Sequence, residues 1–257
     1  MNRWTRRELG NGASLCLELA AGLLENGAET SRVEETVRMA GEALEMDVEA
    51  MVHPTGITIG FGDAEMITRV ARIKNRQINL TKVAELNRLS RCLHRGTVNL
   101  QAFRNEVRAV REAPNQYSLN HELWAAFITC GCLTLVLGGG VPEAAFAVIA
   151  GCVSTYLLIR SASTFPSFLS LFAVGFVSSA FGVLGHELAA LEIEPIVVGS
   201  LLPQMPGLAI VSAMRDLMAG ELVAGNARLA EAVLVTLGMA SGVLACLGFA
   251  ARLGVMA

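Results

Sequence analysis

The sequence predicts a membrane α-helical bundle of five spans preceded by a small α+β cytoplasmic domain. Two observations lead to this fold class. Residues 1–121 hold 16 of the 20 Lys and Arg and 15 of the 23 Asp and Glu, which leaves 4 and 8 for residues 122–257. The second part also contains five successive apolar runs near the spanning length of about 20 residues. We therefore expect a cytoplasmic domain over 1–121 and a transmembrane domain over 122–257, joined by a turn-like linker.

The first domain is expected to begin with two helices. Leucines recur every four positions from Leu15 to Leu23, and Gly27 can end that helix. Ser31 and Glu34 have the capping-box spacing that opens the second helix.

Three strands and two further helices are expected to follow. Apolar residues alternate with polar residues or glycine from Ile57 to Phe61, with flanking strand candidates at 48–53 and 65–73. A helical stretch begins near Asn79, and a last amphipathic helix starts near Leu100. The order is helix, helix, three strands, helix, helix.

Five membrane spans are expected in the second part. They lie near 123–139, 142–159, 165–184, 195–214 and 229–251. The alternative, buried core helices of a soluble protein, rarely needs five such runs in succession. Glycines recur within the runs, and in a bilayer small residues let helix backbones approach closely.

The basic residues predict the orientation of these spans. With the amino terminus in the cytoplasm, the inner loops carry Arg160, Arg215 and Arg228, whereas the outer loops carry glutamates and no Lys or Arg, and only Arg252 departs from the pattern. Positive charge favours the cytoplasmic side. We expect a multi-pass protein of the inner membrane with its amino terminus inside and its carboxyl terminus outside.

No motif for catalysis, a cofactor or a metal is recognisable. The cysteines are scattered and lack the Cys/His pairing of zinc sites, and the histidines lack spacings such as HExxH. We expect no enzyme activity, no cofactor and no metal site.

A basic run lies inside the first domain. It consists of Arg69, Arg72, Lys74, Arg76 and Lys82. Acidic neighbours bring residues 1–121 to a net charge of only +1 (16 minus 15). The run therefore favours a solvated face or a contact with anionic lipid over nucleic-acid binding.

The fourth run contains residues that disrupt a helix. Pro203 and Pro206 each remove an N–H donor, so we expect a kink or break near Gln204 to Gly207. Irregular backbone at membrane depth persists only where protein or a water-filled cavity satisfies it, which favours a polar cavity over a packing kink. Gly207 would begin a second half-helix with its positive end toward the cavity, and Gln204 would add two donors and an acceptor.

Arg215 and Asp216 have two interpretations. In the first interpretation, they are a substrate clamp and a proton-linked carboxylate, because a charge at mid-bilayer must be compensated. Alternatively they lie at the cytoplasmic end of the fourth span as a topology anchor and loop salt bridge, since they follow Pro195 by about twenty residues. Both interpretations stay open at this point.

Four segments together resemble the bacterial threonine/serine exporter family. They are LLENGAETSRVEETV (23–37), HPTGITIGFGD (53–63), RQINLTKVAELNRLSR (76–91) and LLPQMPGLAIVSAMRDLMAGELVAGNAR (201–228). More narrowly, these segments resemble the amino-terminal component of the family, which in some bacteria is a separate chain. The resemblance implies secondary export of a small polar metabolite, threonine or serine or a dicarboxylate such as succinate. It also implies a second, smaller multispanning membrane subunit as partner, and a homo-oligomer stays open.

The fourth run departs from this family at two places. Val211-Ser212 replaces a Thr-Asn pair, and Gln204 stands where an apolar residue is common. Ser212 precedes Asp216 by four residues and shares its helix face, so the first change falls within reach of a transported group. The candidate substrate-binding and transport residues are Pro203, Gln204, Pro206, Gly207, Ser212, Arg215 and Asp216.

One further function class stays open. A membrane-anchored regulatory or scaffold protein would act through its cytoplasmic domain, with spans that only hold it in place. The Pro-Gln-Met-Pro-Gly sequence favours the transporter, because an anchor has no use for a polar, broken span.

Overall fold

The computed structural model describes residues 6–61, 67–74, 76–114, 117–161 and 164–255. Over these residues the fold is mostly helical, with a small three-stranded antiparallel sheet. The chain divides into two compact units. We call Met1–Pro114 with Val211–Leu229 the sheet unit, and Asn115–Ile210 with Ala230–Ala257 the bundle unit.

The sheet unit has the element order that its sequence predicts. It contains α1 (Arg6–Glu25), α2 (Thr30–Ala43), β1 (Val48–His53), β2 (Gly56–Phe61), β3 (Ile67–Arg72), α3 (Leu80–His94) and α4 (Leu100–Glu112). The strands form an antiparallel meander in the order β1-β2-β3. The expected start of the third strand at Glu65 lies outside the described residues.

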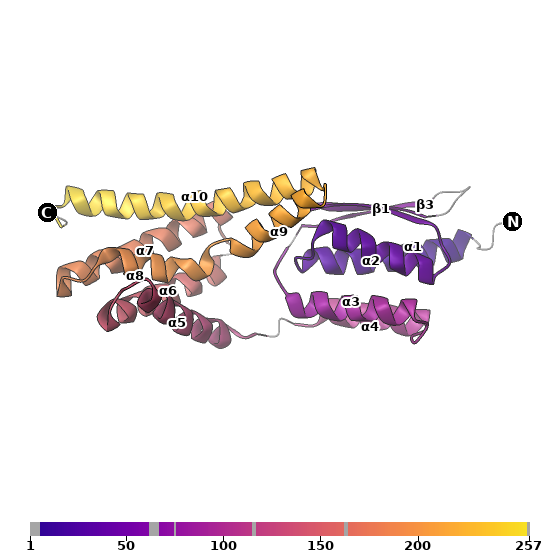
Figure 1. Ribbon diagram of the computed structural model, residues 1–257, viewed down its shortest axis with the longest axis horizontal. Helices are drawn as coiled ribbons and strands as arrows, with labels where there is room; N and C mark the ends of the chain where they lie inside the picture. The colour runs from indigo at the N-terminus through magenta and orange to yellow at the C-terminus, as the bar shows by residue number, and fades with distance from the viewer. Residues whose placement is uncertain (1–5, 62–66, 75, 115–116, 162–163, 256–257) are drawn as a thin grey trace. The chain divides into compact units, whose positions relative to one another are not determined.

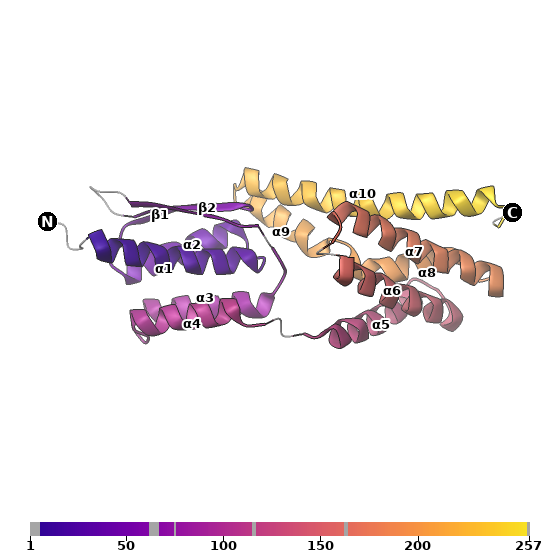
Figure 2. The same ribbon diagram turned by 180° about the vertical axis from the view of Figure 1, so that it is seen from behind.

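Three layers make up the body of this unit. Helices α1 and α2 lie against one face of the sheet, and α3 and α4 lie on the far side of these two helices (Figures 1 and 2). Ile57, Ile59 and Phe61 on alternate positions of β2 are buried, as period-two patterning requires. They join one apolar core with Leu19 of α1 and Leu86 of α3, so the core lies between the layers.

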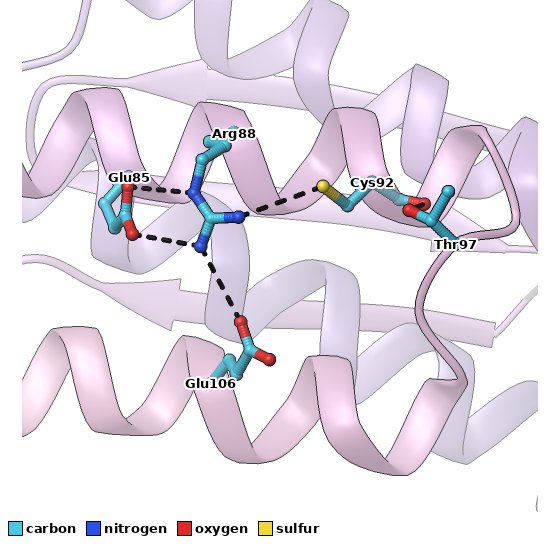
Figure 3. Close-up of polar contacts among 5 residues, drawn as sticks. All are labelled: Glu85, Arg88, Cys92, Thr97 and Glu106. Carbon is cyan, nitrogen blue, oxygen red and sulfur yellow. Dashed lines mark hydrogen bonds and ion pairs between the residues drawn. The ribbon is translucent and has the colours of Figure 1, made fainter.

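The outer surface of α3 and α4 carries a small ion-pair network. Arg88 donates from Nε and Nη2 to the Glu85 carboxylate at 3.0 Å, and its Nη2 lies 3.9 Å from Glu106 Oε2 on α4 (Figure 3). All three side chains are about half exposed, so solvent screens these pairs. The apolar contacts of Phe103 and Val107, both fully buried, hold α4 in place.

The bundle unit consists of long apolar helices. They are α5 (Leu119–Val136), α6 (Val141–Ser161), α7 (Ser167–Ala189), α8 (Ile193–Leu201), the short 3₁₀ helix η1 (Leu202–Gln204), α9 (Gly207–Met218) and α10 (Leu222–Arg252). Helices α9 and α10 each contribute residues to both units. Among the described residues, four helices are long and apolar enough to cross a membrane, or up to five segments if α8 and α9 count as one bent span.

Several helix ends differ from the sequence expectation, among them the start of α5 at Leu119 rather than 123 and the end of α7 at Ala189 rather than 184. Helix α5 ends at Val136 rather than near 139, because Gly138 adopts a left-handed φ of 93°. Helix α10 begins at Leu222 rather than near 229, since its polar residues Asn226 and Arg228 continue the helix instead of ending it.

Glycine lets α7 and α10 approach closely, as expected for membrane helices. A Cβ on Gly175 would overlap the carbonyl oxygen of Met239, and one on Gly242 would overlap that of Phe172. Backbone lies directly against backbone at both positions, so neither glycine can be replaced without separating the helices.

Candidate functional site

The fourth apolar run is a broken helix. Helix α8 ends at Leu201, η1 covers Leu202–Gln204, and α9 begins at Gly207 with a bend of 54° between the two parts. Met205, which precedes Pro206, is extended with φ −64° and ψ 141°, the conformation that a following proline imposes. The expected break near Gln204 to Gly207 is confirmed.

Local hydrogen bonds stabilise the irregular backbone at the break. Met205 N donates to Leu202 O at 3.2 Å, and Gly207 N donates to Met205 O at 2.8 Å. The first α-helical bond beyond the break runs from Ile210 N to Pro206 O at 3.0 Å. The N–H groups of the first turn of α9 have no acceptor within their own helix.

Gln204 carries a polar side chain from the break into the bundle unit. Its Nε2 donates to Thr155 Oγ1 on α6 at 3.3 Å. Its Oε1 is buried and accepts no hydrogen bond from the described residues. An unsatisfied buried acceptor costs about 1–3 kcal/mol, so this atom is suited to receive a donor from a bound solute.

Gly207 lies beside open space. A Cβ built on this residue would meet nothing within 4 Å in the described chain, and the residue itself is exposed. Packing therefore does not require glycine here. The missing side chain leaves the backbone at the start of α9 accessible, which is how glycine admits a ligand to a helix N-terminus.

Buried hydroxyl groups lie on α6 and α7, and none of them was predicted from the sequence as a site residue. Ser154 Oγ of α6 lies 3.2 Å from Ser178 Oγ of α7, and both residues are fully buried. The buried Oγ atoms of Ser170 and Ser179 have no hydrogen-bond partner among the described residues. Serines inside apolar runs were the available signal, but they resemble the small residues that only pack helices.

Arg215 and Asp216 belong to a charged cluster in the sheet unit. Asp216 is fully buried, and its Oδ1 accepts a hydrogen bond from Thr30 Oγ1 at 3.1 Å. Arg228 Nε lies 3.1 Å from Asp216 Oδ2, within ion-pair distance but without the alignment of a hydrogen bond. Arg215 Nη1 donates to Glu29 Oε1 at 2.8 Å.

The cluster joins the α9–α10 turn to the α1–α2 turn. Arg228 Nη2 also donates to Ala28 O at 2.7 Å, so Ala28, Glu29 and Thr30 each accept or donate one of these bonds. Sequence reasoning named Arg215 and Asp216 but not these partners, which lie about 186 residues away in the chain. No local signal pairs residues so far apart.

The predicted site residues therefore fall into two groups. Pro203, Gln204, Pro206 and Gly207 lie together at the break. Arg215 and Asp216 follow Gly207 by eight and nine residues, which places Asp216 about 14 Å further along α9 at 1.5 Å per residue. Ser212 lies between the groups and is partly buried.

The described residues contain no group of three or more His, Cys, Asp or Glu side chains that could hold a metal ion. The six cysteines are free thiols. Burial raises the pKa of the Cys16 thiol in the sheet unit to about 12, so this side chain packs as an apolar group.

Comparisons with known proteins give one matching family model and several relatives. Residues 14–250 match the profile of the family described as putative threonine/serine exporters. The chain is 27% identical to a probable succinate transporter subunit, YjjP, of Klebsiella aerogenes, over 89% of this chain and 90% of that protein. It is 25% identical to the protein of the same name in Escherichia coli, over 91% of this chain and 92% of that protein.

A second kind of relative is longer. The chain is 24% identical to the threonine/serine exporter of Corynebacterium glutamicum, over 86% of this chain but only 47% of that protein. The chain thus spans about nine-tenths of the relatives called subunits and about half of this exporter. No solved structure matches the chain.

Proposed function

The chain belongs to the threonine/serine exporter family, and from this premise we propose that it is one subunit of a secondary exporter of small polar metabolites. The family and the apolar helices support a multi-pass membrane exporter. The observation that carries the proposal further is the break at Leu201–Gly207, where Gln204 Oε1 is buried without a donor. An anchor helix needs neither the break nor the amide.

The break is the proposed solute site. The first-turn N–H groups of α9 and the positive end of its dipole attract a carboxylate, and Gly207 leaves the backbone accessible to it. Gln204 Oε1 accepts from an ammonium or hydroxyl group of the same solute. These groups suit threonine or serine, and the helix N-terminus also suits a dicarboxylate such as succinate.

We place five spans in the membrane, with α8 and α9 as one broken span. The amino terminus is cytoplasmic and the carboxyl terminus lies outside, because Arg160, Arg215 and Arg228 then lie on the cytoplasmic side. This assignment places the sheet unit in the cytoplasm, in keeping with the charge-rich composition of residues 1–121.

A second, smaller membrane subunit completes the transporter. Relatives named as transporter subunits have nearly the same length as this chain, whereas the threonine/serine exporter of Corynebacterium glutamicum is about twice as long. The remaining half of such an exporter corresponds to the proposed partner subunit.

Arg215 and Asp216 serve as a cytoplasmic anchor in this proposal. Their partners Glu29 and Thr30 belong to the sheet unit, and Asp216 lies about 14 Å along α9 from the break. The pair fixes the end of the broken span to the α1–α2 turn, so that movement of α9 is coupled to this turn.

Efflux measurements test the proposal. The chain is expressed with and without a candidate small membrane subunit of the same exporter family, in cells loaded with threonine, serine or succinate. Efflux of one of these solutes is expected only when both chains are present. Full efflux from this chain alone in a host without any partner contradicts the subunit assignment.

A pair of variants tests the site itself. Gln204→Met keeps the length of the side chain and removes its amide, so efflux should fall while membrane insertion stays intact. Met205→Leu is the matched control, because Met205 is adjacent, exposed and apolar. Unchanged efflux from Gln204→Met, or equal losses from both variants, rejects the solute site at the break.

A further inference from the structure

The basic run of the sheet unit lines a cavity. The cavity has a volume of about 530 Å³ and lies where the ends of α1, β3, α3 and α4 meet the loop between β3 and α3. Its charged lining consists of Glu25, Arg72, Lys74, Arg76, Lys82 and Arg111. Arg69, although part of the same run in sequence, is not among the lining residues.

The fold concentrates positive charge that the sequence disperses. Residues 1–121 carry a net charge of only +1, whereas the charged lining of this one cavity sums to +4 (five cations minus one carboxylate). Arg111 joins the run from the end of α4, 29 residues after Lys82. A concave surface lined by one sign of charge focuses the field and raises the local concentration of counter-ions. On a solvated face the same charges would be spread over a convex surface, whereas here they line one cavity.

Two of the cations are held in place and keep donors for a ligand. Lys82 is buried, and its Nζ donates to Arg111 O at 3.1 Å and Ala113 O at 2.6 Å, which uses two of its three N–H groups. Arg111 Nη2 bonds both oxygens of Glu25 at 3.0 Å, while the buried Nε has no hydrogen-bond partner.

The start of α3 adds to the positive potential. A helix N-terminus carries a partial positive charge, and acidic residues normally occupy its first turn. Helix α3 has none there and has Lys82 instead, with only the Asn79 side chain accepting from Lys82 N at 3.1 Å. This placement is unfavourable for the isolated domain and favourable beside a bound anion.

From the cavity, its net charge and the unused donors, we propose that the sheet unit contains a binding site for a small multivalent oxyanion. Exposed Arg72 and Lys74 attract the anion, and Arg111 and Lys82 donate to its oxygens. Lys82 Nζ also donates to the carbonyls of Arg111 and Ala113 at the end of α4, the helix that precedes α5 in the chain. An anion bound to Lys82 therefore competes with these hydrogen bonds at the end of α4. The site belongs to the sheet unit, whereas the proposed solute site belongs to the bundle unit.

Binding of inorganic phosphate to the full chain tests this site. The chain is placed in nanodiscs of phosphatidylcholine, and phosphate is titrated calorimetrically at constant ionic strength. The test variant is Arg72→Gln with Lys74→Gln. The control is Arg69→Gln with Arg91→Gln, which removes the same charge from exposed positions outside the cavity.

Saturable binding is expected for the native chain. The test variant should weaken phosphate binding at least about tenfold, since the cavity loses two of its five positive charges, and the control should stay within about twofold. Absence of saturable phosphate binding, or equal weakening by both double variants, overturns the site. Because no transport step is measured, this result is independent of the efflux experiments.

A second arm identifies the source of the anion. The titration is repeated in nanodiscs that contain phosphatidylglycerol. A lipid headgroup that occupies the cavity lowers the apparent phosphate affinity of the native chain, while the same affinity in both nanodiscs assigns the site to a soluble anion.

Discussion

Replacing Asp216 with alanine should loosen the contact between the α9–α10 turn and the α1–α2 turn. The carboxylate is fully buried, and Arg228, its ion-pair partner, has a side chain only 12% exposed. Removing one partner of a buried pair costs about 3–5 kcal/mol, because the other charge stays buried without compensation. Thr30 Oγ1 also loses its acceptor, which adds about 1 kcal/mol.

The free-energy cost of Asp216→Ala should lie at the lower end of this range, at about 3 kcal/mol. Arg228 keeps its bond to Ala28 O, and its residual exposure allows some solvation. A loss of about 3 kcal/mol raises the local opening equilibrium about a hundredfold, at 1.4 kcal/mol per factor of ten. Amide hydrogen exchange of the full chain measures this opening in peptides that cover residues 28–30 and 219–221.

Arg215→Gln is the matched control. Arg215 is the neighbouring residue and also contacts the α1–α2 turn, but its side chain is 66% exposed. An exposed ion pair contributes at most about 1 kcal/mol, so exchange should rise less than about fivefold. Exchange at residues 28–30 that is unchanged in Asp216→Ala, or equally fast in both variants, refutes the buried-pair argument.

Two further predictions concern packing and pH. Gly175→Ala should reduce the folded fraction on size-exclusion chromatography, because its Cβ would overlap Met239 O. Gly207→Ala should fold normally while export is lost, since nothing lies within 4 Å of a Cβ at this position. Normal folding of both variants contradicts the close α7–α10 approach. The hydrogen bond from Arg108 lowers the pKa of Glu18 below its usual 4.5, so the pair contributes stability above this value and loses it as the pH falls through the lower folded pKa. Thermal unfolding followed from about pH 6 to about pH 3 should therefore show a shallower loss of stability in Glu18→Gln than in the native chain, and identical profiles would exclude this contribution.

Much of the fold could be predicted because it depends on local patterns. The alternation through Ile57, Ile59 and Phe61 predicts a strand, and the apolar runs predict long helices. The break near Gln204 follows from Pro203 and Pro206 for the same reason, since proline acts on its own turn and on the residue before it. The predicted positions of helix ends were less accurate. The left-handed conformation of Gly138 and the start of α10 at Leu222 depend on details outside the apolar pattern.

The contacts of the candidate residues could not be predicted in this way. Thr155 meets Gln204 across 49 residues, and Thr30 meets Asp216 across 186. A single sequence contains no periodicity that relates such distant positions. The sequence therefore leaves the two interpretations of Arg215 and Asp216 open, and their contacts with Glu29 and Thr30 support the anchor that we propose.

Taken by itself, the order of residues determined which segments are apolar enough to span a membrane, where the fourth of them breaks, and which family the chain resembles. Only the tertiary structure decided that Asp216 is buried beside Thr30 and Arg228, and that Lys82 and Arg111 share a cavity. The physical reason is the range of the interactions. Hydrophobic periodicity and proline sterics act within one or two helical turns, whereas burial and electrostatic potential depend on every group that the folded chain brings within a few ångströms.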